Sequence, residues 1–68
     1  MRSNAIKAEG DRFFYNEDIE SARTKYHAAL EEDQENEYAL ANLSVIHLKK
    51  LEYDESIQFA TDALAVVN

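Results

Sequence analysis

The chain has 68 residues and a formal charge of −7, with no cysteine, no proline and a single glycine. This length allows one small domain. The missing cysteines exclude a disulfide framework and a cysteine-based zinc site, and the negative charge argues against a nucleic-acid partner. No apolar run approaches the roughly 18 residues of a membrane-spanning helix, so no membrane partner is expected. The first residues lack the apolar core of a signal peptide, and the default expectation is the cytoplasm, with the nucleus as an alternative.

Apolar and small residues recur at helical spacing in four segments, separated by polar stretches. Gly10 lies inside the first segment, and Asn16 is the expected N-cap of the second. An acidic connector, residues 31–37, joins the second segment to the third. The four helices are predicted at about residues 4–15, 18–31, 37–50 and from 52 onward. The sequence therefore predicts an all-α fold of two antiparallel helix-turn-helix hairpins.

Apolar and small residues of the first half of the chain recur in the second half at one constant distance along the sequence, about 34 residues. We call this distance the repeat offset. This offset aligns the apolar residue Ile6 with Leu40, and the small residue Gly10 with Ser44. Because glycine inside a helix costs about 1 kcal/mol relative to alanine, Gly10 is expected to face its hairpin partner and let the two helices approach closely. The small residues expected across these hairpins are Ala22, Ala29 and Ala63.

The pattern resembles a pair of tetratricopeptide repeats, at residues 3–36 and 37–68. The first unit departs from the family pattern at Glu9, where an apolar residue is usual, and at Gln34, where proline is common. The second unit departs from it at His47, Ser56 and Ala60 and is the weaker match. The family positions in the first unit are Ile6, Gly10, Phe13, Ala22 and Tyr26. The resemblance implies a right-handed solenoid without catalysis. Its concave surface, lined by the first helix of each hairpin, would bind an extended peptide or a helix of a partner protein.

The expected groove combines four polar and four apolar residues, which are Asn4, Lys7, Asp11, Asn42, Phe14, Tyr38, Val45 and Leu48. Lys7 and Asn42 are similar to anchors that the cochaperone branch of the family uses to hold C-terminal carboxylates of chaperones. Asp11 stands where that branch has an asparagine, and an aspartate repels a carboxylate. Two expectations for the groove therefore stay open: an apolar peptide or helix, and an acidic C-terminal peptide.

The last helix carries two apolar stripes. One stripe, expected to pack into the hairpin, consists of Ile57, Ala60, Leu64 and Val67. The other stripe, which has no partner within two repeats, consists of Phe59, Ala63 and Val66. A homo-oligomer formed through this open C-terminal end is therefore an alternative function. The residues assigned to this self-association are Phe59, Ala63, Val66 and Val67.

Residues with catalytic or metal-binding chemistry are few. His27 and Glu31 are four apart on a helix but lack an evident third ligand, and His47 is expected to replace a packing aromatic. The acidic connector lacks the ligand spacing of a calcium loop. We expect no catalytic residue, no metal site and no cofactor. The sequence thus predicts a non-enzymatic protein-interaction module.

Overall fold

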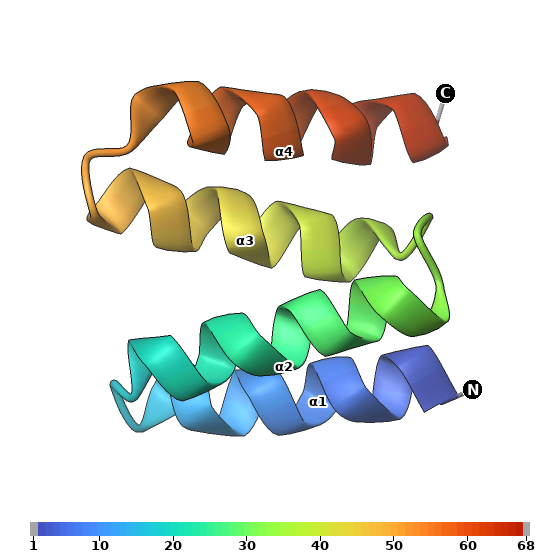
Figure 1. Cartoon of the computed structure of the whole chain (residues 1–68), viewed down its shortest axis with the longest axis vertical. Coiled ribbons are helices and arrows are strands. Elements are labelled where there is room, and N and C mark those ends of the chain that lie inside the picture. The colour runs from blue at the N-terminus through green and yellow to red at the C-terminus, as the bar shows by residue number, and fades with distance from the viewer. Residues whose placement is uncertain (1, 68) are drawn as a thin grey trace.

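A computed structural model describes residues 2–67, which form four α-helices and no strand. The helices are α1 (Arg2–Tyr15), α2 (Ile19–Glu32), α3 (Glu37–Lys49) and α4 (Tyr53–Val67). They run antiparallel, one beside the next in chain order, with α1 and α4 as the outer layers (Figure 1). The predicted all-α pair of hairpins is confirmed. Residue 68, the last of the second predicted repeat, lies outside the described residues.

The two hairpin turns have the same backbone conformation and are separated by the repeat offset. Glu17 and Leu51 take positive φ angles of 64° and 62°. The next residue in each turn, Asp18 or Glu52, donates its N–H five residues back, to Phe13 and His47 respectively. This is the hydrogen bonding of a Schellman motif, which satisfies free carbonyls at a helix C-terminus.

Asn16 is not the N-cap of α2, contrary to the prediction. Asp18 takes that role, because its side chain accepts a hydrogen bond from the Ser21 N–H at 3.2 Å. Asn16 instead donates its backbone N–H to the last carbonyls of α1. The left-handed residue at position 17 places the chain reversal after Asn16, so the cap shifts two residues along the sequence.

Replacing Leu51 by glycine is expected to raise the free energy of unfolding by about 0.5–1 kcal/mol. A side chain in the left-handed region costs roughly 1–2 kcal/mol, and the freedom of glycine in the unfolded chain offsets about 0.4–1 kcal/mol of that gain. Leu51 is 68% exposed, so the substitution removes little packing. Urea unfolding measures the change.

The matched control is Ala41→Gly, at an exposed position inside α3. There glycine gains no backbone relief, and the variant should lose roughly 0.5–1 kcal/mol. A Leu51→Gly variant no more stable than the unchanged chain would contradict the strain assigned to this turn.

Asn36 fixes the connection between the hairpins. Its Oδ1 accepts hydrogen bonds from the N–H groups of Tyr38 and Ala39, both at 3.1 Å, which caps α3. Its Nδ2 donates to Ser3 Oγ at 2.8 Å and to Asn4 Oδ1 at 3.0 Å. The same side chain therefore joins the beginning of α3 to the beginning of α1.

The core lies along α2 and α3. Its buried members are Ala22, Tyr26, Ala29, Ala39, Leu43 and Ile46, none more than 1% exposed. Half-buried side chains from α1, α2 and α4, including Ile6 and Phe59, pack around this cluster. Burial of such apolar side chains is the main force that holds the two hairpins together.

Gly10 lies where its helix approaches α2, as predicted, although its neighbour differs from the expected alanines. A Cβ atom on Gly10 would lie 2.8 Å from Cε1 of Tyr26 and 3.2 Å from Cβ of Lys25. The space that glycine leaves is therefore taken by an aromatic ring. The second hairpin uses a pair of serines, since Ser44 Oγ donates to the Ser56 carbonyl at 2.8 Å and Ser56 Oγ donates to the Ser44 carbonyl at 2.9 Å.

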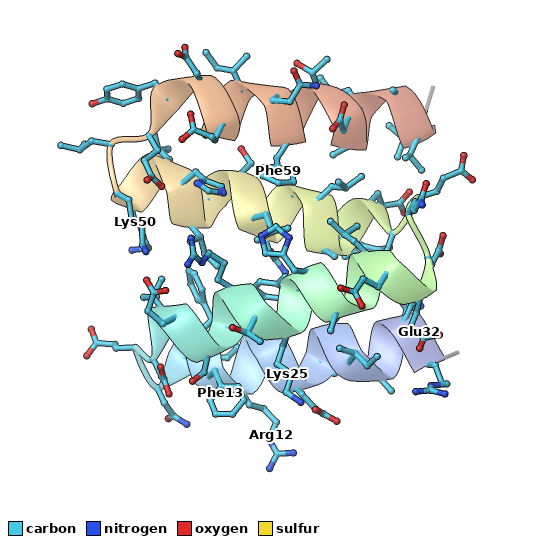
Figure 2. All side chains as sticks on the ribbon, in the orientation of Figure 1. Arg12, Phe13, Lys25, Glu32, Lys50 and Phe59 are labelled. Carbon is cyan, nitrogen blue, oxygen red and sulfur yellow. The ribbon has the colours of Figure 1, made fainter. Side chains whose placement is uncertain are left out.

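The stripe of α4 that was expected to pack inward is the more exposed one in the structure, since Ile57 and Leu64 are 63% and 61% exposed, although Ala60 is half-buried. Phe59 points from α4 toward α3 (Figure 2) and stacks on the buried His47 ring, with centroids 5.3 Å apart. Ala63 and Val66 are also half-buried. The reason is Ser56, whose contact with Ser44 turns its own side of α4 inward, and residues 59, 63 and 66 share that side. Of the residues assigned to self-association, Val67 alone is exposed.

Within residues 2–67 no helix has both the length and the apolar character needed to cross a membrane.

Candidate functional site

The candidate site is the surface shared by α1 and α3, the first helices of the two hairpins. We call it the α1–α3 face, and it consists of the predicted residues Asn4, Lys7, Asp11, Phe14, Tyr38, Asn42, Val45 and Leu48. Side chains from the two helices contact each other along its length. The spacing within each helix, three or four residues, accounts for the shared side.

Asp11 is the polar centre of the α1–α3 face. Its Oδ1 accepts hydrogen bonds from the Tyr26 hydroxyl at 2.6 Å and from Asn42 Nδ2 at 3.2 Å. Its Oδ2 forms an ion pair with Lys7 Nζ at 2.7 Å. One partly buried carboxylate thereby links α1, α2 and α3. Burial raises the pKa of Tyr26 well above 10.0. The hydrogen bond to Asp11 and the negative charge of Asp11 raise this pKa further.

Lys7 and Asn42, the two predicted polar anchors, are thus already engaged within the protein. The Lys7 ammonium bonds to Asp11, and the Asn42 amide donates to the same carboxylate. Sequence reasoning recognised Asp11 as a repelling charge but missed that it binds both neighbours. The i,i+4 spacing of Lys7 and Asp11 is typical of an ion pair on a helix and could have predicted the first of these two contacts.

Two cations lie over aromatic rings of this face. Lys7 Nζ is 5.3 Å from the centroid of the Tyr38 ring, and Lys49 Nζ is 5.8 Å from the centroid of the Phe14 ring. Both distances are within the range of about 6 Å in which a cation is attracted to an aromatic face. Lys49 was not predicted as part of the site. These contacts join α1 to α3 at two points.

The rest of the face is apolar and exposed. Tyr38, Val45 and Leu48 are 58%, 43% and 52% exposed, and their spacing places them along one side of α3. Asn4 lines a hollow of about 130 Å³ near Tyr38, and Phe14 lines another of about 450 Å³ beside Lys49. The α1–α3 face therefore presents an apolar row next to a fixed polar network, with a depression at each end.

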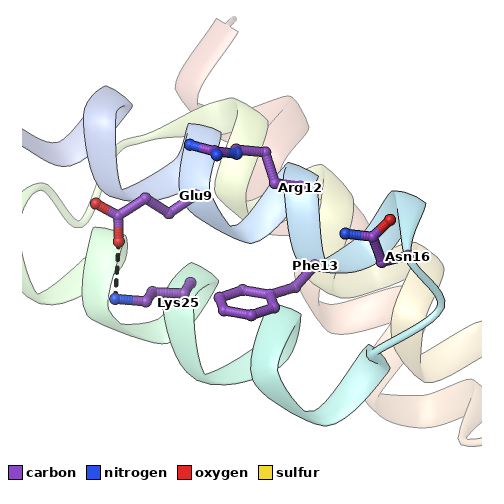
Figure 3. Close-up of a pocket in the computed structure, with 5 residues that line it drawn as sticks. All are labelled: Glu9, Arg12, Phe13, Asn16 and Lys25. Carbon is purple, nitrogen blue, oxygen red and sulfur yellow. Dashed lines mark ion pairs between the residues drawn. The ribbon is translucent and has the colours of Figure 1, made fainter.

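A separate hollow of about 300 Å³ lies between α1 and α2 (Figure 3). Glu9 and Lys25 form an ion pair of 2.8 Å beside it. The hydrogen bond and charge of Lys25 lower the pKa of Glu9. The lining residues are Glu9, Arg12, Phe13, Asn16 and Lys25. None of them belongs to the α1–α3 face, and no sequence motif indicated this hollow.

His47 joins α3 to the beginning of α4. Its Nδ1 lies 2.8 Å from Oε1 of Glu52, and with Glu55 these residues place three potential metal ligands within 4.8 Å of one another. The Glu52 hydrogen bond already occupies Nδ1, and Glu55 is exposed. We assign this cluster to helix connection. His27 lies edge-on to Phe59, and burial followed by the charge of Arg23 lowers its pKa.

The fold and the site define an all-helical protein of two hairpins with an amphipathic α1–α3 face. Comparison with family models, curated proteins and solved structures gives no match to this chain.

Proposed function

We propose that the chain is a non-enzymatic module of tetratricopeptide type whose α1–α3 face binds a segment of a partner protein. The observation that carries the proposal is the exposed apolar row of Tyr38, Val45 and Leu48 beside the ordered network of Asp11. Exposed apolar side chains that cluster beside polar groups are typical of protein-binding surfaces. The identical hairpin turns, separated by the repeat offset, support the repeat interpretation.

The chemistry of the face favours a ligand with apolar anchors. A helix or extended peptide could place small apolar side chains against Val45 and Leu48, and the aromatic groups Tyr38 and Phe14 lie near the two ends of the row. The polar network leaves little unpaired charge at the centre of the face, because the Lys7 ammonium is neutralised by Asp11. Recognition would therefore depend on shape and apolar burial.

A cochaperone-type acidic peptide is the less favoured ligand. Its terminal carboxylate would have to displace Asp11 from Lys7 and Asn42, and the displaced aspartate would repel it. A peptide ending in Glu-Glu-Val-Asp, compared with its C-terminally amidated twin, tests this ligand. We expect no carboxylate-dependent NMR shift at Lys7 or Asn42. Carboxylate-dependent shifts at both residues would favour the acidic ligand instead.

Selection from a displayed library of random peptides tests the proposal. The chain should enrich peptides with apolar anchors, and Val45→Lys should weaken binding of an enriched peptide by about tenfold or more, because a charge interrupts the apolar row. Thr24→Lys adds the same charge at an exposed position of α2 and should leave binding unchanged. Failure to enrich any peptide, or equal weakening by both variants, would contradict binding at the α1–α3 face.

A further inference from the structure

A second exposed apolar surface lies on α4. We call it the α4 face; it consists of Tyr53, Ile57, Leu64 and Val67, which are 56%, 63%, 61% and 60% exposed. The spacing of these residues places them along one side of the helix. α4 is an outer layer of the molecule and packs against α3 (Figure 1). Within residues 2–67, no element covers the α4 face.

The internal repeat shows what covers the matching side of α2. Ile19 and Leu30, which the repeat offset aligns with Tyr53 and Leu64, are half-buried against the core that α2 and α3 share. The Lys50 side chain at the end of α3 points toward α2 (Figure 2). Its ammonium group forms an ion pair with Glu20 of α2. The side of α2 that packs against α3 therefore corresponds, in the second hairpin, to the side of α4 that is left uncovered.

The opposite end of the molecule has a different character. The repeat offset aligns Glu9 and Arg12 of α1 with Leu43 and Ile46, which are fully buried where α3 meets α2. Glu9 and Arg12 are both exposed, and Glu9 pairs with Lys25 across the outer surface (Figure 3). The α1 end is thus polar and the α4 end apolar. A second copy could not cover the α4 face with its own α1 without burying those charges.

The charged residues of α4 limit which kind of partner can bind to the α4 face. α4 carries Asp54, Glu55 and Asp62 and no lysine or arginine. Helical spacing places Asp54 at the edge of the α4 face and Glu55 and Asp62 on the other side of the helix. Two copies that met through this face would add no basic partner for Asp54, and each copy carries a net charge of −7. The repeat offset aligns Asp54 with Glu20, the residue that pairs with Lys50. A helix seated on α4 as α3 is seated on α2 would bring its C-terminal turn near Asp54.

We propose that the α4 face is a docking surface for an amphipathic helix of a partner protein that carries a lysine or arginine in its last turn. The helix lies antiparallel to α4 and buries its apolar side against Ile57 and Leu64. Its basic residue pairs with Asp54, as Lys50 pairs with Glu20. This surface lies on a different helix from the α1–α3 face, so the two surfaces are separable by substitution.

A stapled helical peptide with the sequence of residues 36–50 is the test probe, because it carries the apolar side and the terminal lysine of a helix that already packs in this way. Fluorescence anisotropy should show that the peptide binds the chain. Leu64→Lys, at an exposed position, should weaken this binding by about tenfold, and a peptide with the Lys50→Glu change should also bind more weakly. Val45→Lys is the matched control and should leave the affinity unchanged.

Four outcomes would overturn the proposal. The peptide could fail to bind, or it could bind the Leu64→Lys variant as tightly as the unchanged chain. Weakening by Val45→Lys alone would place the peptide on the α1–α3 face. Sedimentation that shows a dimer of the unchanged chain and a monomer of Leu64→Lys would make a second copy the occupant. Circular dichroism of Leu64→Lys confirms that the variant is folded.

Discussion

Replacement of Asp11 by alanine is expected to lower the free energy of unfolding by about 2–3 kcal/mol, because hydrogen bonds to a charged group are lost and a buried donor stays unpaired. The Tyr26 hydroxyl, the Asn42 amide and the Lys7 ammonium all bond to this carboxylate. Tyr26 is 1% exposed, so water cannot readily replace the acceptor. Urea unfolding measures the loss.

The ionisation of Tyr26 gives a second readout of the same substitution. Asp11 contributes to the raised pKa of Tyr26 through its hydrogen bond and its charge, after burial itself. In the Asp11→Ala variant the pKa of Tyr26 should therefore fall, although burial keeps it above the ordinary value of 10.0. Ultraviolet absorbance at alkaline pH follows the phenolate.

Asp11→Asn is the matched variant. The amide oxygen can still accept from Tyr26 and Asn42, whereas the ion pair with Lys7 is lost, so the expected destabilisation is about half that of alanine. If Asp11→Ala were as stable as the unchanged chain, the carboxylate would not hold the three helices together. An unchanged Tyr26 pKa would contradict the hydrogen bond itself.

Gly10→Ala is expected to lower the free energy of unfolding by about 1–3 kcal/mol, the usual cost of overpacking a core. Helix propensity alone predicts the opposite, a gain of about 1 kcal/mol. The new Cβ would lie 2.8 Å from Cε1 and 3.0 Å from Cδ1 of Tyr26. That ring is buried and is held at its hydroxyl by Asp11, so it has little room to move. Urea unfolding decides the sign.

A double-mutant cycle isolates the cause of this effect. In a Tyr26→Leu background the ring is absent, and the added methyl group of Gly10→Ala should cost less than in the unchanged chain. A Gly10→Ala variant that is more stable than the unchanged chain would show that propensity dominates and that the hairpin does not require a close approach at this position.

The repeat pattern made the helices predictable. Apolar positions that recur at the repeat offset define both the helices and their order, and the positive φ angles at Glu17 and Leu51 are separated by the same offset. The end of α1 was harder to read, because Asn16 and Asp18 are both good capping residues. The choice between them depends on a turn conformation that neither Asn16 nor Glu17 indicates by residue type.

Apolar spacing alone could not show which side of α4 faces the core. Both sides of this helix carry apolar residues, so the spacing fits either orientation. The side of α4 that faces inward is the one that carries Ser56, a polar residue that is 8% exposed and forms hydrogen bonds with Ser44. Because serine gives no apolar signal, the sequence predicted the wrong stripe.

The α1–α3 face was predictable as a set of positions but not as a network. The spacing of residues on α1 and α3 places them on one side of each helix. The bonds from Asp11 to Tyr26 and Asn42, however, span 15 and 31 residues of sequence. Such contacts depend on how the hairpins pack, and no local pattern reports them.

The most direct test of the proposed function is an NMR titration of the isotope-labelled chain with a peptide enriched from the library. We expect the largest amide shifts on α1 and α3, around Tyr38, Val45 and Leu48, and we expect Val45→Lys to reduce them strongly at the same peptide concentration. Shifts confined to α2 and α4, with those three residues unaffected, would contradict binding at the α1–α3 face.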